Sequence, residues 1–417
     1  MIVALLLGAA IQAASLDAPP PEPCLSICDA AALRPFFDKL ARVQTEGRTV
    51  RIMQIGDSHT AGDQITGAWR AALQARYGNA GRGVLAPGRP YQGYLTRDVT
   101  AQQSAGWSVA GIFGPTYRSA NTTPVGVANY SFTALSDGAQ LSIAADRDGF
   151  DRFTACALTG PGAGTLTLTI GSVVRPVALA AARVESRCVQ VEALAAPVAT
   201  LSVAGGPVTV TSWSTERAAP GVILSNLGTV GAQLIHFART DDRLVATEIA
   251  QYRPDLLVIA FGTNEAFTPR FSASDYASRL RAGIARVKRL APDTPILILG
   301  APDSATTRPE IQTGESGRSA PCTTGLLSSF DATLQDWRPT AALGVVQATQ
   351  RRVAHDEGVA FWDWSRAMGG RCTPLQWART GLMRGDRVHF TSAGAKIIAD
   401  RLQADLDAAA FAVGAVR

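Results

Sequence analysis

The sequence is short of charge, of basic blocks and of long apolar runs. Only 18% of its 417 residues are charged while 47% are hydrophobic, which excludes an intrinsically disordered chain. The net charge is +5, but the Lys and Arg residues are scattered, so nucleic acid is not an expected partner. No stretch is apolar for long enough to span a bilayer, so we expect no transmembrane anchor. These absences leave a large globular protein of roughly two to three domains.

Cysteine and histidine are also scarce, and the spacing of the cysteines is informative. Six cysteines allow fifteen disulfide connectivities. A metal site is not expected, because only one cysteine pair is close in sequence and no histidine stands beside it. The even number instead predicts three disulfides and an oxidising compartment. Sequence order favours the pairs Cys24–Cys28, Cys156–Cys188 and Cys322–Cys372.

Residues 1–15 have the features of a secretory leader. They are uncharged and contain a short apolar run, and small residues follow at Ala13 and Ser15, spaced as signal peptidase requires. The usual basic residues at the start are missing, which a misplaced start codon would explain. We predict a signal peptide over residues 1–15 and a periplasmic or secreted protein.

The rest of the chain shows two kinds of hydrophobic pattern. Residues 16–97 and 221–417 alternate apolar strands with helical periodicity, which predicts a parallel sheet covered by helices. Residues 98–220 show period-2 alternation, which predicts an all-β sandwich. We expect this sandwich to be inserted into a discontinuous α/β domain; the alternative is a long β excursion of the same domain. The glycine-rich residues 78–93 are expected to form a surface loop. The α/β strands are expected at residues 50–55, 256–260, 295–299 and 359–362.

One serine follows the first of these strands. Residues 50–55 are apolar and partly β-branched, Gly56 breaks the run, and helical spacing begins at Ile65. Ser58 is therefore expected on the turn after a buried strand, where open α/β sheets present reactive groups. Backbone amides on such a turn can donate to an oxyanion. The alternative is an ordinary turn in which Asp57 or Ser58 caps a helix.

A serine nucleophile needs a base, and the base needs an orienting acid. His389 stands just ahead of the last predicted helix, and Asp386 lies three residues earlier, so a tight loop could bring the two side chains together. The other histidines have plainer explanations. We expect His236 to pack within a helix, His355 to be solvated and His59 to support the wall of the pocket.

Two further turns carry candidate oxyanion donors. Asn264 follows the predicted strand 256–260, so its side-chain amide is expected at the same sheet edge as Ser58. Gly231 lies in a glycine turn before another helix, where its amide could point the same way. Each donor would lower the barrier by about 3 kcal/mol. For either turn the alternative is ordinary strand-end turn chemistry.

Taken in order, these motifs resemble the four blocks of the SGNH (GDSL-like) hydrolase superfamily. The resemblance implies a three-layer parallel sheet flanked by helices. It assigns Ser58 as the nucleophile, His389 as the base and Asp386 as the orienting acid. The implied oxyanion hole comprises the Ser58 amide, the Gly231 amide and the Asn264 side chain. The matching motifs are Gly56-Asp57-Ser58, Gly231, Gly262-Thr263-Asn264 and Asp386-x-x-His389.

The sequence departs from the usual superfamily pattern at two positions. His59 stands where leucine is usual and Glu265 where aspartate is usual, and both bear on subfamily and substrate more than on activity. The leader, the opening Gly-Asp-Ser-His-Thr-Ala-Gly-Asp and the inserted β-domain resemble bacterial peptidoglycan O-acetylesterases. In those enzymes the insert resembles a carbohydrate-binding module. Trp213 and Tyr130 could stack on sugars, but core positions are favoured for both.

The resemblance implies an exported serine esterase. We expect it to remove O-acetyl groups from a polysaccharide through an acyl-enzyme. The favoured substrate is peptidoglycan, and the group removed is the MurNAc O-acetyl group. We expect no metal or organic cofactor, and a monomer. One alternative is an O-acetyltransferase or an esterase for another acetylated glycan. Another is a non-catalytic wall-binding protein on a hydrolase scaffold.

Overall fold

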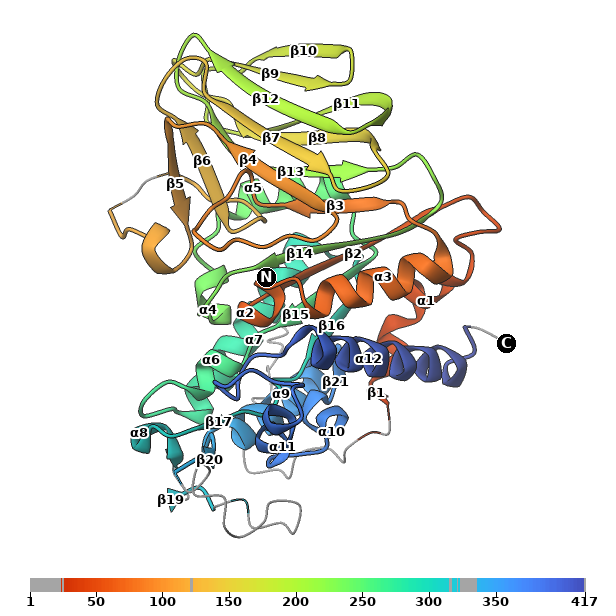
Figure 1. Cartoon of the computed structure of the whole chain (residues 1–417), viewed down its shortest axis with the longest axis vertical. Coiled ribbons are helices and arrows are strands. Elements are labelled where there is room, and N and C mark those ends of the chain that lie inside the picture. The colour runs from red at the N-terminus through yellow and green to blue at the C-terminus, as the bar shows by residue number, and fades with distance from the viewer. Residues whose placement is uncertain are drawn as a thin grey trace, which may run out of the picture.

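A computed structural model describes residues 24, 26–120, 123–314, 317–320, 322 and 336–415. The predicted signal peptide lies outside the described residues. Figure 1 shows an α/β part in the lower half of the molecule and antiparallel strands stacked above it. Among the residues that the structure describes, no helix combines the length and the hydropathy needed to cross a bilayer.

The α/β part is built on one six-stranded sheet, in which all neighbouring strands are parallel except β1 and β21. The predicted strands are confirmed, with ends within a residue or so of those expected. In sheet order the six strands are β1 (Ile27–Cys28), β21 (Ala360–Trp362), β16 (Ile296–Leu299), β15 (Leu256–Ala260), β2 (Thr49–Gly56) and β14 (Gly221–Gly228). The edge strands β1 and β14 were not among the predicted ones.

Helices cover both faces of this sheet. Side chains alternate along each strand, so each face carries apolar residues that the helices bury. Ile52 belongs to the apolar cluster with Trp69 and Ile398, whereas Met53 belongs to the cluster with Ile284. The predicted three-layer α/β fold is therefore confirmed. The helices are α1 (Arg34–Ala41), α2 (Ser58–Ala61), α3 (Ile65–Tyr77), α4 (Leu234–Phe237), α5 (Asp242–Tyr252), α6 (Thr263–Ala266), α7 (Ala273–Leu290), α8 (Pro309–Gln312), α9 (Leu343–Asp356), α10 (Trp364–Met368), α11 (Thr373–Arg379) and α12 (Ser392–Ala412).

The upper part consists of two antiparallel sheets, as the period-2 pattern predicts. One has the order β10 (Val173–Ala178), β9 (Thr165–Ile170), β12 (Val198–Ala204), β7 (Gln140–Ala145) and β4 (Val99–Gln103). The other has the order β11 (Ser186–Ala196), β8 (Phe150–Leu158), β13 (Thr209–Glu216), β6 (Tyr130–Ala134) and β5 (Trp107–Gly111). Trp213 and Tyr130 are buried in this core. The domain boundaries at residues 98 and 220 stay a prediction.

The prediction of a surface loop over residues 78–93 is wrong in its central part. Residues Gly81–Leu85 form a buried strand, β3, that pairs with β13. Its glycines permit a close approach to other backbone: a Cβ on Gly81 would come within 2.6 Å of the Glu216 Cα. Strand β3 thereby joins the upper sheets to a segment that precedes residue 98.

A buried carboxylate also links the two parts. Glu248 on α5 accepts hydrogen bonds from the Thr211 and Ser212 hydroxyls of β13 and, at 2.6 Å, from the Val127 amide. Burial raises the pKa of Glu248, although all three of these hydrogen bonds act to lower it. The upper sheets are therefore tied to α5 by hydrogen bonds as well as by apolar packing.

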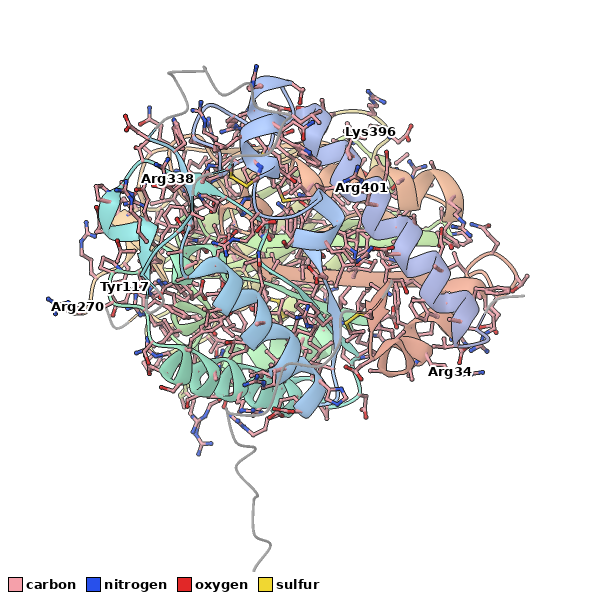
Figure 2. All side chains as sticks on the ribbon, turned by 90° about the horizontal axis from the view of Figure 1, so that it is seen from below. Arg34, Tyr117, Arg270, Arg338, Lys396 and Arg401 are labelled. Atoms are coloured by element: carbon pink, nitrogen blue, oxygen red, sulfur yellow. A yellow bond between two sulfur atoms is a disulfide. The ribbon has the colours of Figure 1, made fainter. Side chains whose placement is uncertain are left out.

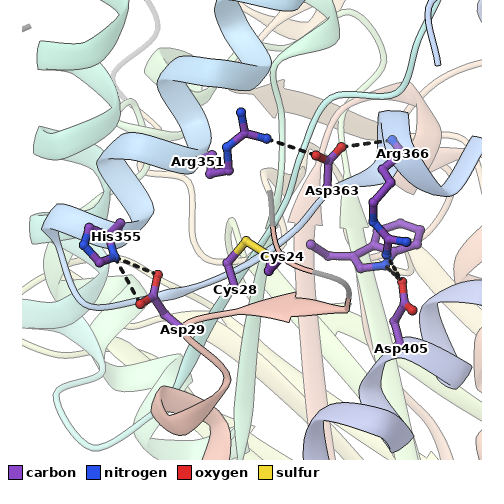
Figure 3. Close-up of a disulfide and its surroundings, with 9 residues drawn as sticks. Cys24, Cys28, Asp29, Arg351, His355, Asp363, Arg366 and Asp405 are labelled. Atoms are coloured by element: carbon purple, nitrogen blue, oxygen red, sulfur yellow. Dashed lines mark hydrogen bonds and ion pairs between the residues drawn. A yellow bond between two sulfur atoms is a disulfide. The ribbon is translucent and has the colours of Figure 1, made fainter. Parts of the chain in front are cut away.

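The disulfides follow the pairing favoured by sequence order. Cys156 and Cys188 stand directly opposite each other on β8 and β11. Cys24 is bonded to Cys28, the last residue of β1, and Figure 3 shows this disulfide. The third pair is Cys322–Cys372. Near this third disulfide, α8 stands among short antiparallel pairs, in which β17 (Ala305–Thr306) pairs with β20 (Arg338–Pro339) and β18 (Thr313–Gly314) pairs with β19 (Gly317–Arg318).

A buried ion-pair network supports the segment after the first strand. Asp63 is fully buried, and its Oδ2 atom lies 2.9 Å from the Arg70 guanidinium, 3.1 Å from that of Arg82 and 2.9 Å from the Arg97 amide. Burial raises the pKa of Asp63, but the two guanidinium groups outweigh it and hold the pKa well below its usual range. The ionised Asp63 therefore stabilises the folded state at pH values above the usual carboxyl pKa. This stabilisation is lost as the pH falls through the pKa of the folded state.

We expect Asp63→Asn to lower the free energy of unfolding by about 3–5 kcal/mol at pH 7, because it leaves the buried Arg82 guanidinium without a carboxylate and the buried Arg70 guanidinium with only the exposed Asp98. Urea unfolding measures this, and the difference from the unmodified chain should shrink on acidification. The matched control is Asp400→Asn on α12. Asp400 pairs with the exposed Lys396, which is labelled in Figure 2, and such a contact is worth about 0.3–0.5 kcal/mol. Equal effects of the two substitutions would contradict the role of the network.

Candidate active site

The turns that carry Ser58, Gly231 and Asn264 begin at one level of the central sheet. In the β2 ladder Gly56 is opposite Gly228 of β14 on one side and Ala260 of β15 on the other. The three strands therefore end together, and the segments after them lie side by side. The Asp57 amide donates to the Ala260 carbonyl at 3.2 Å, and the Thr229 amide donates to the Gly56 carbonyl at 2.9 Å.

Two of these strand ends require glycine because other backbone comes too close for a side chain. A Cβ on Gly56 would lie 2.7 Å from the Ala260 carbonyl oxygen, and a Cβ on Gly228 would collide with the Ala61 amide of α2. The glycines thus let α2, which begins at Ser58, lie directly over the sheet edge.

Ser58, His389 and Asp386 form one chain of hydrogen bonds. The Ser58 Oγ lies 2.9 Å from the His389 Nε2, and the His389 Nδ1 lies 2.8 Å from the Asp386 Oδ2. Because a carboxylate only accepts, Nδ1 carries the proton and Nε2 is left to accept from the serine hydroxyl. This is the tautomer that a general base beside a serine needs.

The loop of His389 is organised by Asp386. The Oδ1 atom of Asp386 accepts from the Val388 and His389 amides, both at 2.9 Å. Burial raises the pKa of Asp386, but the hydrogen bonds from the His389 ring and from these amides outweigh it and hold the pKa well below its usual range. The side chain therefore stays ionised and keeps the His389 ring oriented.

Asn264 lies on α6 beside the turn of Gly231. Its Nδ2 atom donates to the Ala232 carbonyl at 3.0 Å and lies 3.5 Å from the Asp57 Oδ2. Gly231 has a left-handed φ of 76°, and a Cβ there would come within 2.9 Å of the Phe113 ring. The structure thus brings Asn264 and the Gly231 turn next to the Ser58 turn. Phe113, from the antiparallel part, packs against the Gly231 turn.

Glu265 has a structural position that the sequence did not reveal. Its side chain is buried, with Oε1 accepting from the Leu234 amide at 3.0 Å and Oε2 accepting from the Gly262 amide at 2.9 Å. It therefore clamps the α6 turn to the α4 turn. Burial raises the pKa of Glu265 to about 7, against the effect of these hydrogen bonds.

The other three histidines form no hydrogen bond with the Ser58 hydroxyl, and each contacts other groups. His236 is half-buried on α4 and stacks on Phe113 at 4.2 Å between ring centroids. His355 is exposed on α9 and pairs with Asp29 (Figure 3). His59 is buried beside His389, with ring centroids 5.4 Å apart. Within the described ranges, no group of three or more His, Cys, Asp or Glu residues is arranged to hold a metal ion.

Comparisons with known proteins show which proteins the chain is similar to. Residues 203–397 match the model of the GDSL-like lipase/acylhydrolase family. A solved structure of a peptidoglycan O-acetylesterase is 27% identical, with a TM-score of 0.74 over 94% of this chain and 99% of that chain. The chain contains a GDSL-like lipase/acylhydrolase domain. It has the SGNH hydrolase fold and is a carboxylic-ester hydrolase.

The other comparisons are more distant. A family two carbohydrate esterase from Clostridium thermocellum is 13% identical, with a TM-score of 0.30 over 75% of this chain and 100% of that chain. No curated protein matches the chain. The family match includes Gly231, Asn264, Asp386 and His389 of the hydrolase but begins after Ser58. The catalytic roles of all five residues stay a prediction.

We expect Asp386→Asn to lower kcat for an aryl acetate by about 10³-fold or more. The Asn Oδ1 would take over the backbone hydrogen bonds, so its amide nitrogen would face the His389 Nδ1 and force the ring into the wrong tautomer. The matched control is Asp275→Asn, at an exposed carboxylate that pairs with Arg279 on α7. Retention of activity within tenfold in Asp386→Asn would contradict the assigned orientation.

Proposed function

We propose that this hydrolase is an exported serine esterase that removes O-acetyl groups from a polysaccharide, peptidoglycan being the substrate and the MurNAc O-acetyl group the target. The observation that carries the proposal is the hydrogen-bonded chain from Ser58 through His389 to Asp386. The similar solved structure is a peptidoglycan O-acetylesterase and is alike over nearly the whole chain, the antiparallel sheets included, which supports the choice of substrate. The disulfides support export.

In the proposed reaction the Ser58 oxygen attacks the acetyl carbonyl while the His389 Nε2 takes the hydroxyl proton. The oxyanion that forms is stabilised by the Ser58 amide, the Gly231 amide and the Asn264 side chain. The His389 imidazolium then returns its proton to the departing sugar oxygen. Water attacks the acetyl-serine with His389 as base again, and acetate leaves.

We expect Ser58→Ala to abolish acetate release from O-acetylated peptidoglycan while leaving thermal unfolding unchanged, since Ser58 is partly exposed and only its hydroxyl is removed. Ser104→Ala, at an exposed serine among the antiparallel strands, is the control and should retain full activity. A serine-directed phosphonate should add its mass to the unmodified chain at Ser58 and not to the variant. Near-normal acetate release by Ser58→Ala would reject the mechanism.

The substrate is tested separately from the mechanism. We expect acetate release from O-acetylated peptidoglycan to exceed that from acetylated xylan by at least about tenfold in kcat/KM, which corresponds to about 1.4 kcal/mol in transition-state binding. A glycan acceptor added to the same assay should not divert acetyl from water. Preference for xylan would reject peptidoglycan as substrate, and transfer to the acceptor would indicate an acetyltransferase.

A further inference from the structure

His59 lies buried between the Ser58 turn and the His389 loop, and both of its ring nitrogens meet hydrogen-bond acceptors. Nδ1 lies 3.1 Å from the Asp57 Oδ1 and Nε2 lies 3.0 Å from the Val388 carbonyl oxygen. The Val388 carbonyl has no proton to give, and the Asp57 Oδ1 already accepts from the His59 backbone amide, so both atoms act as acceptors toward the ring. The side chain is only 4% exposed.

A neutral imidazole satisfies only one of these two contacts. It carries a single N–H, so its other nitrogen would place a lone pair against an oxygen atom about 3 Å away in a buried site. Such a buried acceptor–acceptor contact is unfavourable. A doubly protonated ring donates to both oxygens.

We infer that His59 is held as an imidazolium cation that ties the loop of His389 to the turn of Ser58, and that it is a positioning residue for the base. The inference rests on the roles proposed above for Ser58 and His389. It assigns a function to His59, which the sequence alone predicted only to support the pocket wall.

The electrostatic surroundings favour the cation. Burial lowers the pKa of His59, but the charge and hydrogen bond of Asp57, the Val388 carbonyl and the charge of Asp386 together outweigh it, so the pKa is raised. The titratable side chains that face the ring are Asp57, Asp386 and His389, and the neighbouring rings of Trp364 and Phe390 carry no charge. When His389 takes its proton during turnover, two imidazolium rings are balanced by two carboxylates.

The contact fixes the peptide that precedes the base. The Val388 amide donates to Asp386, and the Val388 carbonyl accepts from His59, so the residue is held at both of its polar groups. Its other neighbour, Arg387, has a left-handed φ of 52°, a conformation that a non-glycine residue keeps only when its surroundings impose it. Asp57 holds the His59 ring on the side of the Ser58 turn, and its Oδ1 also accepts from the His59 amide at 2.9 Å.

The protonation state is tested in the unmodified enzyme by nitrogen NMR of the ¹⁵N-histidine-labelled chain. The His59 signals are those that disappear in His59→Gln. We expect both ring nitrogens of His59 to be protonated at pH 7. A single protonated nitrogen at pH 7 would overturn the inference, whatever the activity of the enzyme.

The positioning role is tested by two neutral variants that differ in which nitrogen they replace. The amide nitrogen of Gln reaches the place of Nε2 and keeps the bond to Val388, whereas that of Asn reaches only the place of Nδ1. We expect His59→Asn to lose about 10²-fold in kcat for an aryl acetate with KM within about twofold, and His59→Gln to lose about tenfold or less, because displacement of the base costs rate rather than binding. Equal kcat values in the two variants would overturn the role of the Val388 contact.

His355→Gln is the matched control, since His355 also pairs with an aspartate, Asp29, but is exposed on α9. It should leave kcat unchanged. The outcomes are separable from those of the proposed function. An active Ser58→Ala variant rejects the triad, whereas failure of the inference alone leaves Ser58→Ala inactive and the His59 ring singly protonated.

Discussion

The site depends on the register of three neighbouring parallel strands. Because Gly56, Gly228 and Ala260 are paired across the β14–β2–β15 ladder, the turns after them start at the same height. A slip of one residue in either ladder would exchange the two faces of a strand, moving Ile52 and Met53 into each other's apolar clusters. The cores on both faces therefore hold the register, and the register brings three sequence-distant turns together.

The base reaches this edge without the help of a strand. His389 lies in a loop ahead of α12, and its position depends on individual hydrogen bonds. The Arg384 amide donates to the His389 carbonyl at 2.7 Å, and the Ala305 amide donates to the Arg387 carbonyl at 3.1 Å. Asp386 and His59 supply the others. A loop held by a few directed bonds is more easily displaced than a strand end, so its anchoring side chains matter as much as the base itself.

Much of the fold could be predicted from the sequence because burial leaves a local period. Four of the six α/β strands, the antiparallel texture of the upper sheets and the disulfide pairs were expected at the places where they occur. The prediction failed at β3, whose five residues contain two glycines and show no clear alternation. Its pairing with β13 is decided by backbone contacts more than 120 positions away, which no local pattern records.

For the site, the sequence by itself determined which chemical groups are available and that each of four blocks follows a strand or precedes a helix. Only the tertiary structure decided that they meet, and what holds them. His59 and Glu265 stood out in the sequence merely as unusual residues, because their partners, Val388 and Leu234, lie 329 and 31 positions away. Periodicity reports whether a side chain is buried, whereas a hydrogen bond between distant loops exists only once the sheet beneath them has formed.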